Sequence, residues 1–261
     1  MELKKSLSQH LLKDKNVLKK MLSKTDITKK DVVLEIGAGT GELTSLLKDI
    51  AGSVYAVEID KGFSPYLDKL SSQNKNIRIV YQDFLKLKLA DLASQHGVLK
   101  VIGNIPYGLT GPILFKIFME RKYLKKAYLT FQREVAERIV AKPKTRMFGT
   151  LSVISQVLSN VKLEFFIPPQ VFVPPPQVES AFVSFTFYEE YLTIPETFFQ
   201  FVKNCFRHKR KLLFNSLKAV YSISTVEFLF EKAKLHKSVR AEEILPQKFL
   251  EMFYCIEREN G

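Results

Sequence analysis

The chain has 261 residues, of which 46% are hydrophobic and 12% aromatic, so it is long and apolar enough to fold around a packed core. Its 40 lysines and arginines against 27 aspartates and glutamates give a net charge of +13, which favours a polyanionic partner such as nucleic acid. Two distant cysteines, four scattered histidines and the lack of a long apolar run argue against a disulfide framework, a metal site and a membrane span.

Short apolar runs alternate with amphipathic segments over the first part of the chain. The apolar runs predict strands at Val32–Ile36, Val54–Ile59, Ile77–Tyr81, Val98–Ile102 and Ala127–Phe131. Helical spacing of apolar residues predicts helices at Glu42–Ile50, Phe63–Leu70, Ile113–Met119 and Glu134–Val140. This alternation predicts an α/β fold of the Rossmann-like kind, with a parallel sheet between two layers of helices.

The pattern changes in the last part of the chain. A helical stretch follows Phe148-Gly149, and Val161–Ile167 and Ser180–Phe187 then read as a pair of strands around a proline-rich connection, the second with the alternation of an antiparallel edge strand. Beyond Ile194 the spacing is helical throughout. We therefore expect a main domain over residues 1–188 and a small all-helical domain over residues 189–261.

A glycine-rich turn, Gly37-Ala38-Gly39-Thr40-Gly41, follows the first predicted strand. Glycines let the backbone turn sharply and approach a ligand closely. Taken alone, the turn fits a dinucleotide fold, an S-adenosylmethionine (SAM) fold or a plain strand-to-helix turn. Its spacing is Gly-x-Gly-x-Gly and not Gly-x-Gly-x-x-Gly, which weakens the dinucleotide reading.

Acidic residues end or follow the next two predicted strands. Glu58 can accept hydrogen bonds from the two hydroxyls of a ribose, and Asp83 can accept one from the exocyclic amine of an adenine. Phe84 can cover the adenine ring. Because the carboxyl ends of parallel strands meet at one edge of a sheet, the glycine turn and the two acids together predict a site for one adenosine-containing ligand.

The tetrapeptide Asn104-Ile105-Pro106-Tyr107 follows the fourth predicted strand and indicates the reaction. An aromatic amine is a poor nucleophile because its lone pair is delocalised into the ring. The side-chain oxygen of Asn104 and the carbonyl of Pro106 can accept its two N–H bonds and aim the lone pair at an activated methyl group, while Tyr107 stacks on the base. No strong general base is needed, since the proton leaves only after the nitrogen has become positively charged.

These motifs resemble those of the ribosomal RNA adenine N6-dimethyltransferase family over nearly the whole chain. The similar segments are Ser8–Asp14, Glu35–Thr44, Val57–Asp60, Gly103–Tyr107 and Val171–Ser180, with Leu11 and Gly108 departing from the usual Phe and Asn. The resemblance implies that SAM is the cofactor and that it contacts His10, Leu12, Gly37, Glu58, Asp83 and Asn104. It also implies that Tyr107 and Phe172 enclose a flipped adenine from both sides.

The small-subunit branch of this family is the closer resemblance. Phe131–Arg138, Phe148–Val153, Arg240–Glu243 and the basic run Arg207–Lys211 are similar to it. The resemblance implies N6,N6-dimethylation of adenines in 16S-type rRNA during ribosome biogenesis, by a cytoplasmic monomer acting on small-subunit rRNA within a pre-30S particle. The lysine-rich N-terminus and the helical domain would grip RNA phosphates, with no metal and no membrane involved.

Two other functions fit the same resemblance. A large-subunit rRNA adenine N6-methyltransferase that confers macrolide resistance shares the sheet and the Asn-x-Pro-Tyr motif. A ribosome assembly factor or transcription factor can keep the fold without catalysis, although the intact Glu58, Asp83 and Asn104 argue against lost activity.

Overall fold

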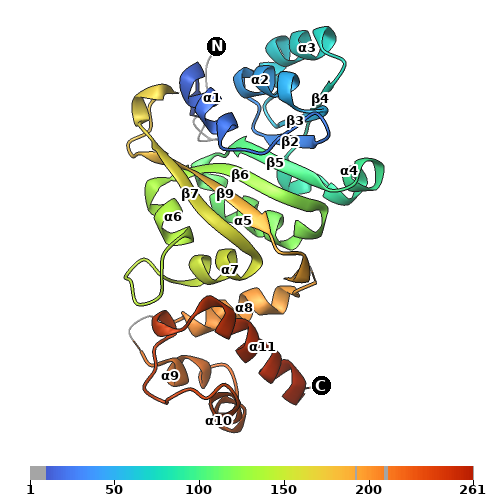
Figure 1. Cartoon of the computed structure of the whole chain (residues 1–261). Helices are drawn as coiled ribbons and strands as arrows, with labels where there is room; N and C mark the ends of the chain where they lie inside the picture. Colours follow the sequence, from blue (N-terminus) through green and yellow to red (C-terminus); the bar gives the residue numbers. More distant parts are fainter. Residues whose placement is uncertain (1–9, 192, 209–210, 261) are drawn as a thin grey trace. The chain divides into compact units, whose positions relative to one another are not determined.

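The structure, a computed structural model, describes residues 10–191, 193–208 and 211–260 (Figure 1). They form two compact units: the first runs to Ala136 and includes Lys162–Phe187, and the second comprises Glu137–Val161 and the chain from Tyr188 onward. The second unit thus resumes close to the division expected at residue 188, but it also takes in an earlier segment. The assignment of separate roles to residues 1–188 and 189–261 stays a prediction.

A seven-stranded sheet in the order β4-β3-β2-β5-β6-β9-β7 is the centre of the first unit (Figure 1). The strands from β4 to β6 are parallel, and β9 is antiparallel to β6. In this order they are β4 (Ile77–Tyr81), β3 (Ser53–Glu58), β2 (Val32–Ile36), β5 (Leu99–Asn104), β6 (Leu124–Gln132), β9 (Ser180–Phe187) and β7 (Ser159–Ile167). The expected α/β fold with a mostly parallel sheet is confirmed.

Strand β9 is antiparallel as expected, but it lies inside the sheet, and β7 is the strand at the edge. Two of its polar residues have partners within the protein. Ser184 donates a hydrogen bond to Glu164 over 2.7 Å, and Ser180 is fully buried beside the hydroxyl group of Tyr107. The alternation that predicted an edge strand therefore comes partly from serines with internal hydrogen bonds.

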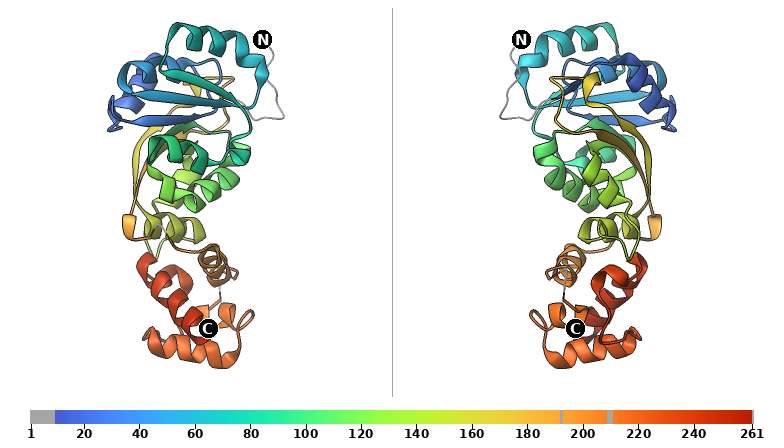
Figure 2. Two further views of the ribbon diagram at one scale, coloured as in Figure 1. Left: turned by 90° about the vertical axis from the view of Figure 1, so that its right-hand side faces the viewer. Right: turned by 90° about the vertical axis from the view of Figure 1, so that its left-hand side faces the viewer.

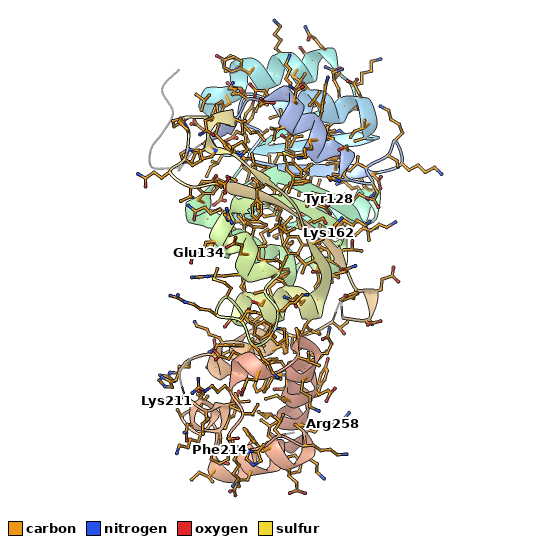
Figure 3. The ribbon with its side chains drawn as sticks, turned by 60° about the vertical axis from the view of Figure 1, so that its left-hand side comes forward. Tyr128, Glu134, Lys162, Lys211, Phe214 and Arg258 are labelled. Atoms are coloured by element: carbon orange, nitrogen blue, oxygen red, sulfur yellow. The ribbon has the colours of Figure 1, made fainter. Side chains whose placement is uncertain are left out.

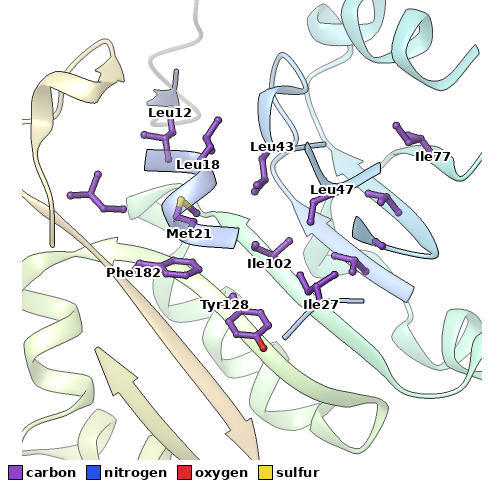
Figure 4. Packing of buried hydrophobic residues seen from close by; sticks show 14 of the residues in the cluster. Leu12, Leu18, Met21, Ile27, Leu43, Leu47, Ile77, Ile102, Tyr128 and Phe182 are labelled. Atoms are coloured by element: carbon purple, nitrogen blue, oxygen red, sulfur yellow. The ribbon is translucent and has the colours of Figure 1, made fainter. Parts of the chain in front are cut away.

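Helices cover both faces of this sheet. On one face, α1 (Lys15–Ser23) and α2 (Glu42–Ile50) contribute to a core cluster with residues of β5, β6 and β9 (Figure 4). On the other face, Phe118 of α5 (Thr110–Met119) packs edge-on against Phe185 of β9, with ring centroids 6.0 Å apart. The remaining helices are α3 (Ser64–Gln73), α4 (Leu89–His96) and α6 (Arg133–Ile139).

Helix α1 was not among the expected helices, although the sequence carries a signal for its start. Asp14 caps its N-terminus, where one carboxylate oxygen accepts the backbone N–H groups of Asn16 and Val17 over 2.8 and 3.0 Å. Leu18 and Met21 then face the core (Figure 4). The lysines of this segment, Lys15, Lys19 and Lys20, are exposed, and they make its apolar face hard to recognise in the sequence.

The second unit is helical, as expected, and its helices gather in one group (Figure 2). They are α7 (Thr150–Leu158), α8 (Glu196–Cys205), α9 (Leu213–Leu217), α10 (Ile223–Lys232) and α11 (Pro246–Asn260). Phenylalanines join α8 and its end to α11, with Phe198 and Phe253 at 5.5 Å and Phe206 and Phe249 also at 5.5 Å between ring centroids. None of the helices in the described ranges is both long and apolar enough to cross a membrane.

The predicted basic run lies partly outside the described residues. Arg207 and Lys211 are exposed on the second unit, as are other basic side chains such as Arg258 (Figure 3). Lys209 and Arg210 are outside the described ranges, and so are the first lysines of the N-terminus and the Ser8-Gln9 part of the N-terminal motif.

Candidate active site at the carboxyl ends of the strands

A pocket opens where β2, β3, β4 and β5 end. Its empty volume, which includes open solvent at the mouth, is about 820 Å³. Many of the side chains and turns expected to act together line it: His10, Gly37, Glu58, Asp83, Asn104, Pro106 and Tyr107. Ligands collect at this edge of open α/β sheets, so the strand-end residues meet as the sequence predicted.

The glycine turn forms the floor of the pocket in a conformation that requires glycine. Gly37, Gly39 and Gly41 have φ angles of 73°, 55° and 84°, in the left-handed region that other residues rarely adopt. A Cβ atom on Gly39 would also lie 2.7 Å from a methyl carbon of Leu11. The turn therefore combines a left-handed backbone with close approach to its neighbour, and it leaves its main chain facing the pocket.

Glu58 is held rigidly at the end of β3. Its two carboxylate oxygens accept the backbone N–H groups of Gly39 and Asp60, each over 2.8 Å. Burial raises the pKa of Glu58, although these two hydrogen bonds act in the opposite direction. A carboxylate offers about four acceptor positions, so acceptor capacity remains for ligand hydroxyls. Its position thus suits a ribose.

Asp83 follows β4 and lies on the same wall. One of its oxygens, Oδ1, accepts the backbone N–H of Leu85 over 2.9 Å, which fixes the turn. For the other oxygen, no hydrogen bond is found within the part of the chain that the structure describes. Phe84 is buried and also lines the pocket. The pair can therefore bind a flat base by its amine and its face.

The carboxamide of Asn104 is fixed at both ends. Its nitrogen donates a hydrogen bond to the main-chain carbonyl of His10 over 2.7 Å, and its oxygen accepts one from the hydroxyl of Thr130 over 2.6 Å. Because a carbonyl can only accept, the nitrogen must face His10, which settles which end is the oxygen. One lone pair of that oxygen remains for a substrate N–H.

Sequence reasoning missed Thr130, which is fully buried in β6 opposite Asn104 in β5. The residue has no motif around it. Its partner depends on the register between β5 and β6, and that register is set by packing over the whole sheet. Only a model of the paired strands could have found it.

Tyr107 begins a short 3₁₀ turn, Tyr107–Leu109, which follows Asn104 and Pro106. Its hydroxyl lies 2.5 Å from the hydroxyl of Ser180, and its ring stacks with the imidazole of His10 at 5.4 Å between centroids and 29° between planes. The carbonyl of Pro106 accepts the N–H of Leu109 over 3.0 Å, which leaves one lone pair for another donor. Burial raises the pKa of Tyr107, so the phenol keeps its proton at neutral pH.

The two-stranded sheet β1–β8 determines which side chains of the N-terminal motif face the pocket. In β1 (Leu11–Leu12) and β8 (Phe172–Val173), Leu11 pairs with Val173 and Leu12 with Phe172. Side chains alternate between the two faces, so the first pair points one way and the second the other. Leu11 lines the pocket, whereas Leu12 and Phe172 are buried in the core cluster (Figure 4).

This arrangement bears on two expected contacts, which stay predictions. The Leu12 side chain does not line the pocket; its neighbour Leu11 does, and the alternation of a two-residue strand is the physical reason. Phe172 is only 1% exposed, and its ring packs in the core cluster. The ring that does face Tyr107 in this structure is that of His10.

Comparison with known proteins agrees with this geometry. The sequence matches the family described as ribosomal RNA adenine dimethylase over residues 1–258. A relative from Mycoplasma mobile, named ribosomal RNA small subunit methyltransferase A, is 39% identical over 252 residues, which cover 96% of this chain and 97% of that protein. A protein of the same name from Levilactobacillus brevis is 34% identical over 268 residues, which cover 98% of this chain and 90% of that protein.

Solved structures share the fold. A dimethyladenosine transferase from Plasmodium falciparum has a TM-score of 0.81 at 24% identity, with 96% of this chain and 98% of that chain covered. The 23S rRNA methyltransferase ErmE has a TM-score of 0.72, also at 24% identity, with 95% and 99% covered. Both show the fold, while the family match and the curated relatives show the relationship: this chain belongs to the ribosomal RNA adenine dimethylase family.

Proposed function

We propose that this protein transfers methyl groups from SAM to N6 of adenines in small-subunit rRNA, two to each adenine, during ribosome biogenesis. The observation that carries the proposal is the carboxamide of Asn104, fixed by His10 and Thr130 in the pocket at the strand ends. The names of the curated relatives support the small subunit as the source of the RNA.

The residues of the pocket suit SAM as cofactor. Glu58 would hold the ribose hydroxyls, Asp83 the adenine amine, and the main chain at Gly37 would lie against the amino-acid part. Leu11 would cover this part of the pocket by its contact with the glycine turn. When bound, SAM supplies a methyl group on a positively charged sulfur.

The remaining groups would prepare the adenine amine for attack. The free lone pairs of the Asn104 side-chain oxygen and of the Pro106 carbonyl would accept the two N–H bonds, which favours a pyramidal nitrogen. One face of the Tyr107 ring stacks with His10, and the other face would stack on the base. These are effects of position and of preorganised dipoles, so no side chain has to remove a proton before transfer.

The charge of the chain supports an RNA substrate. A net charge of +13 and exposed basic residues such as Arg207 and Lys211 on the helical unit would neutralise phosphates and release counterions. We propose that residues 189–261 contribute most of this contact and that the protein acts as a monomer on a pre-30S particle in the cytoplasm. Binding should then weaken steeply as salt concentration rises.

The test is methylation of undermethylated 30S and 50S particles with radiolabelled SAM, followed by mapping of the labelled base. The proposal expects label on adenines of the small-subunit rRNA, as N6,N6-dimethyladenine. Label confined to the 50S particle would identify a large-subunit enzyme of the macrolide-resistance kind. Label in neither particle, with RNA binding retained, would favour a protein that keeps the fold as an assembly or transcription factor.

A further inference from the structure

The hydroxyl groups of Tyr107 and Ser180 form a contact that joins two distant parts of the first unit. The oxygens are 2.5 Å apart although the residues are 73 positions apart in the sequence. Ser180 is the first residue of β9, is fully buried and pairs with Gln132 of β6. It does not line the pocket, so it has no direct contact with a ligand there.

The two partners differ in how firmly their backbones are held. Ser180 lies in a strand in the interior of the sheet, where ladder hydrogen bonds fix its position. Tyr107 lies in a single 3₁₀ turn, and the direction of its ring depends on two rotatable side-chain bonds. The far end of the ring is therefore held by Ser180, and one ring face is held by His10.

We propose that Ser180 is a positioning residue, which sets the plane of the Tyr107 ring and so the plane of the adenine stacked on it. The inference rests on the proposed function, since it concerns the base-stacking role of Tyr107. The adenine amine must point at the methyl group within a narrow range of distance and direction, and small misplacements of a reacting group are costly in rate. The hydrogen bond between Ser180 and Tyr107 would thus fix the ring relative to the sheet, and the ring would in turn fix the base.

A double-mutant cycle separates positioning from a general effect on stability. The variants are Ser180→Ala, Tyr107→Phe, which keeps the ring and removes the hydroxyl, and the double variant. We expect each single variant to lower kcat for methyl transfer about three- to tenfold, the factor for one lost neutral hydrogen bond. The double variant should be no slower than the worse single variant, because both changes remove the same bond.

The matched control is Ser184→Ala. Ser184 lies on the same strand and donates a bond of similar length, 2.7 Å, but its partner is Glu164 and not Tyr107. Its removal should leave kcat within about twofold of the unchanged protein, since a loss of strand stability alone does not move the Tyr107 ring. The KM for SAM should stay unchanged in Ser180→Ala and Ser184→Ala, because neither serine lines the pocket.

The outcomes are distinct. A normal kcat in Ser180→Ala, or rate losses that multiply in the double variant, would overturn the positioning role. Equal losses in Ser180→Ala and Ser184→Ala would also overturn it, in favour of a purely structural effect. If the unchanged protein transfers no methyl group to either ribosomal particle, the proposed function fails independently of the positioning role. The double-mutant cycle is then measured as the affinity for adenosine-containing RNA. Ser180→Ala should still weaken that affinity as much as Tyr107→Phe does.

Discussion

The side-chain nitrogen of Asn104 donates a hydrogen bond to the main-chain carbonyl of His10, 2.7 Å away and 94 residues earlier in the chain. The bond ties the N-terminal segment to the end of β5, and the ring of the same His10 stacks on Tyr107. In the proposed mechanism a single carboxamide therefore has two tasks: it would present an acceptor to the substrate, and it holds the segment that carries Leu11, which lines the pocket.

Replacement of Asn104 by Ala should remove both tasks at once. We expect methyl transfer to fall at least about a hundredfold, as happens when a preorganised polar group is removed from a reacting centre. Binding of RNA should change little, because it depends on basic residues spread over the surface. Single-turnover methylation and filter binding of the same RNA measure the two effects. Near-normal turnover would remove Asn104 from the mechanism.

Thr130 supports the other end of this carboxamide and should matter through its hydroxyl group alone. Thr130→Val keeps the shape of the buried side chain but removes the donor to Asn104. We expect kcat to fall about three- to tenfold because the carboxamide is then held only at its nitrogen. The KM for SAM should change little, since Thr130 does not line the pocket.

Thr130→Ser is the matched control for that variant. It restores the hydroxyl and loses a methyl group, so it should recover most of the rate while costing stability through a small cavity. Stopped-flow or quench measurements of kcat, together with urea unfolding, separate the two properties. A slow Ser variant with a fast Val variant would show that packing, and not the hydrogen bond, governs this position.

The strand-end residues could be predicted from the sequence because they depend on local order. Gly37, Glu58, Asp83 and Asn104 each follow an apolar run, and parallel strands bring their carboxyl ends together whatever the details of packing. Their roles in binding stay predictions, but their common location is confirmed.

Other parts of the site depend on contacts that no local pattern contains. Ser180 and Thr130 reach Tyr107 and Asn104 only through the register of β9 and β6. The orientation of the Leu12 side chain toward the core follows from its pairing with Phe172. A strand of two residues is too short for its inward and outward side chains to be predicted from the sequence pattern. Family resemblance named these two residues without their orientation.

The opposite faces of β1 predict opposite consequences for adjacent leucines. Leu11→Ala removes an apolar wall of the pocket and should weaken SAM binding about tenfold, with less than about 1 kcal/mol lost from the free energy of unfolding. Leu12→Ala creates a cavity in the core cluster and should cost about 2–4 kcal/mol of that free energy, with affinity for SAM nearly unchanged in the folded protein. Calorimetric titration with SAM and urea unfolding measure both. The reverse pattern would contradict the orientation of β1.

Glu35 makes the stability of the first unit depend on pH between about 5 and 8. It is 1% exposed in β2 and accepts a hydrogen bond from Thr44 over 2.6 Å. Burial raises its pKa from 4.5 to about 8, and the nearby Glu58 and Glu42 act in the same direction. The pKa of Glu35 is therefore higher in the folded chain than in the unfolded chain. At any pH between these two pKa values the folded chain binds more protons, so the free energy of unfolding falls as pH rises from about 5 to about 8.

Glu35→Gln should remove this dependence. Gln keeps the size and the acceptor for Thr44 but carries no charge, so the variant should gain on the unchanged protein as pH rises, by up to about 1.4 kcal/mol per pH unit. Urea unfolding at pH 5.5, 7.0 and 8.5 measures the slope of the free energy of unfolding against pH.

Glu42→Gln is the control. Burial acts to raise the pKa of Glu42, but hydrogen bonds from Lys13 and Thr40 outweigh it and hold that pKa below its ordinary value. Glu42 therefore stays charged in both states across this window, and its replacement should leave the slope largely intact. A slope equal in the Glu35→Gln variant and the unchanged protein would mean that Glu35 is ionised in the folded chain at neutral pH.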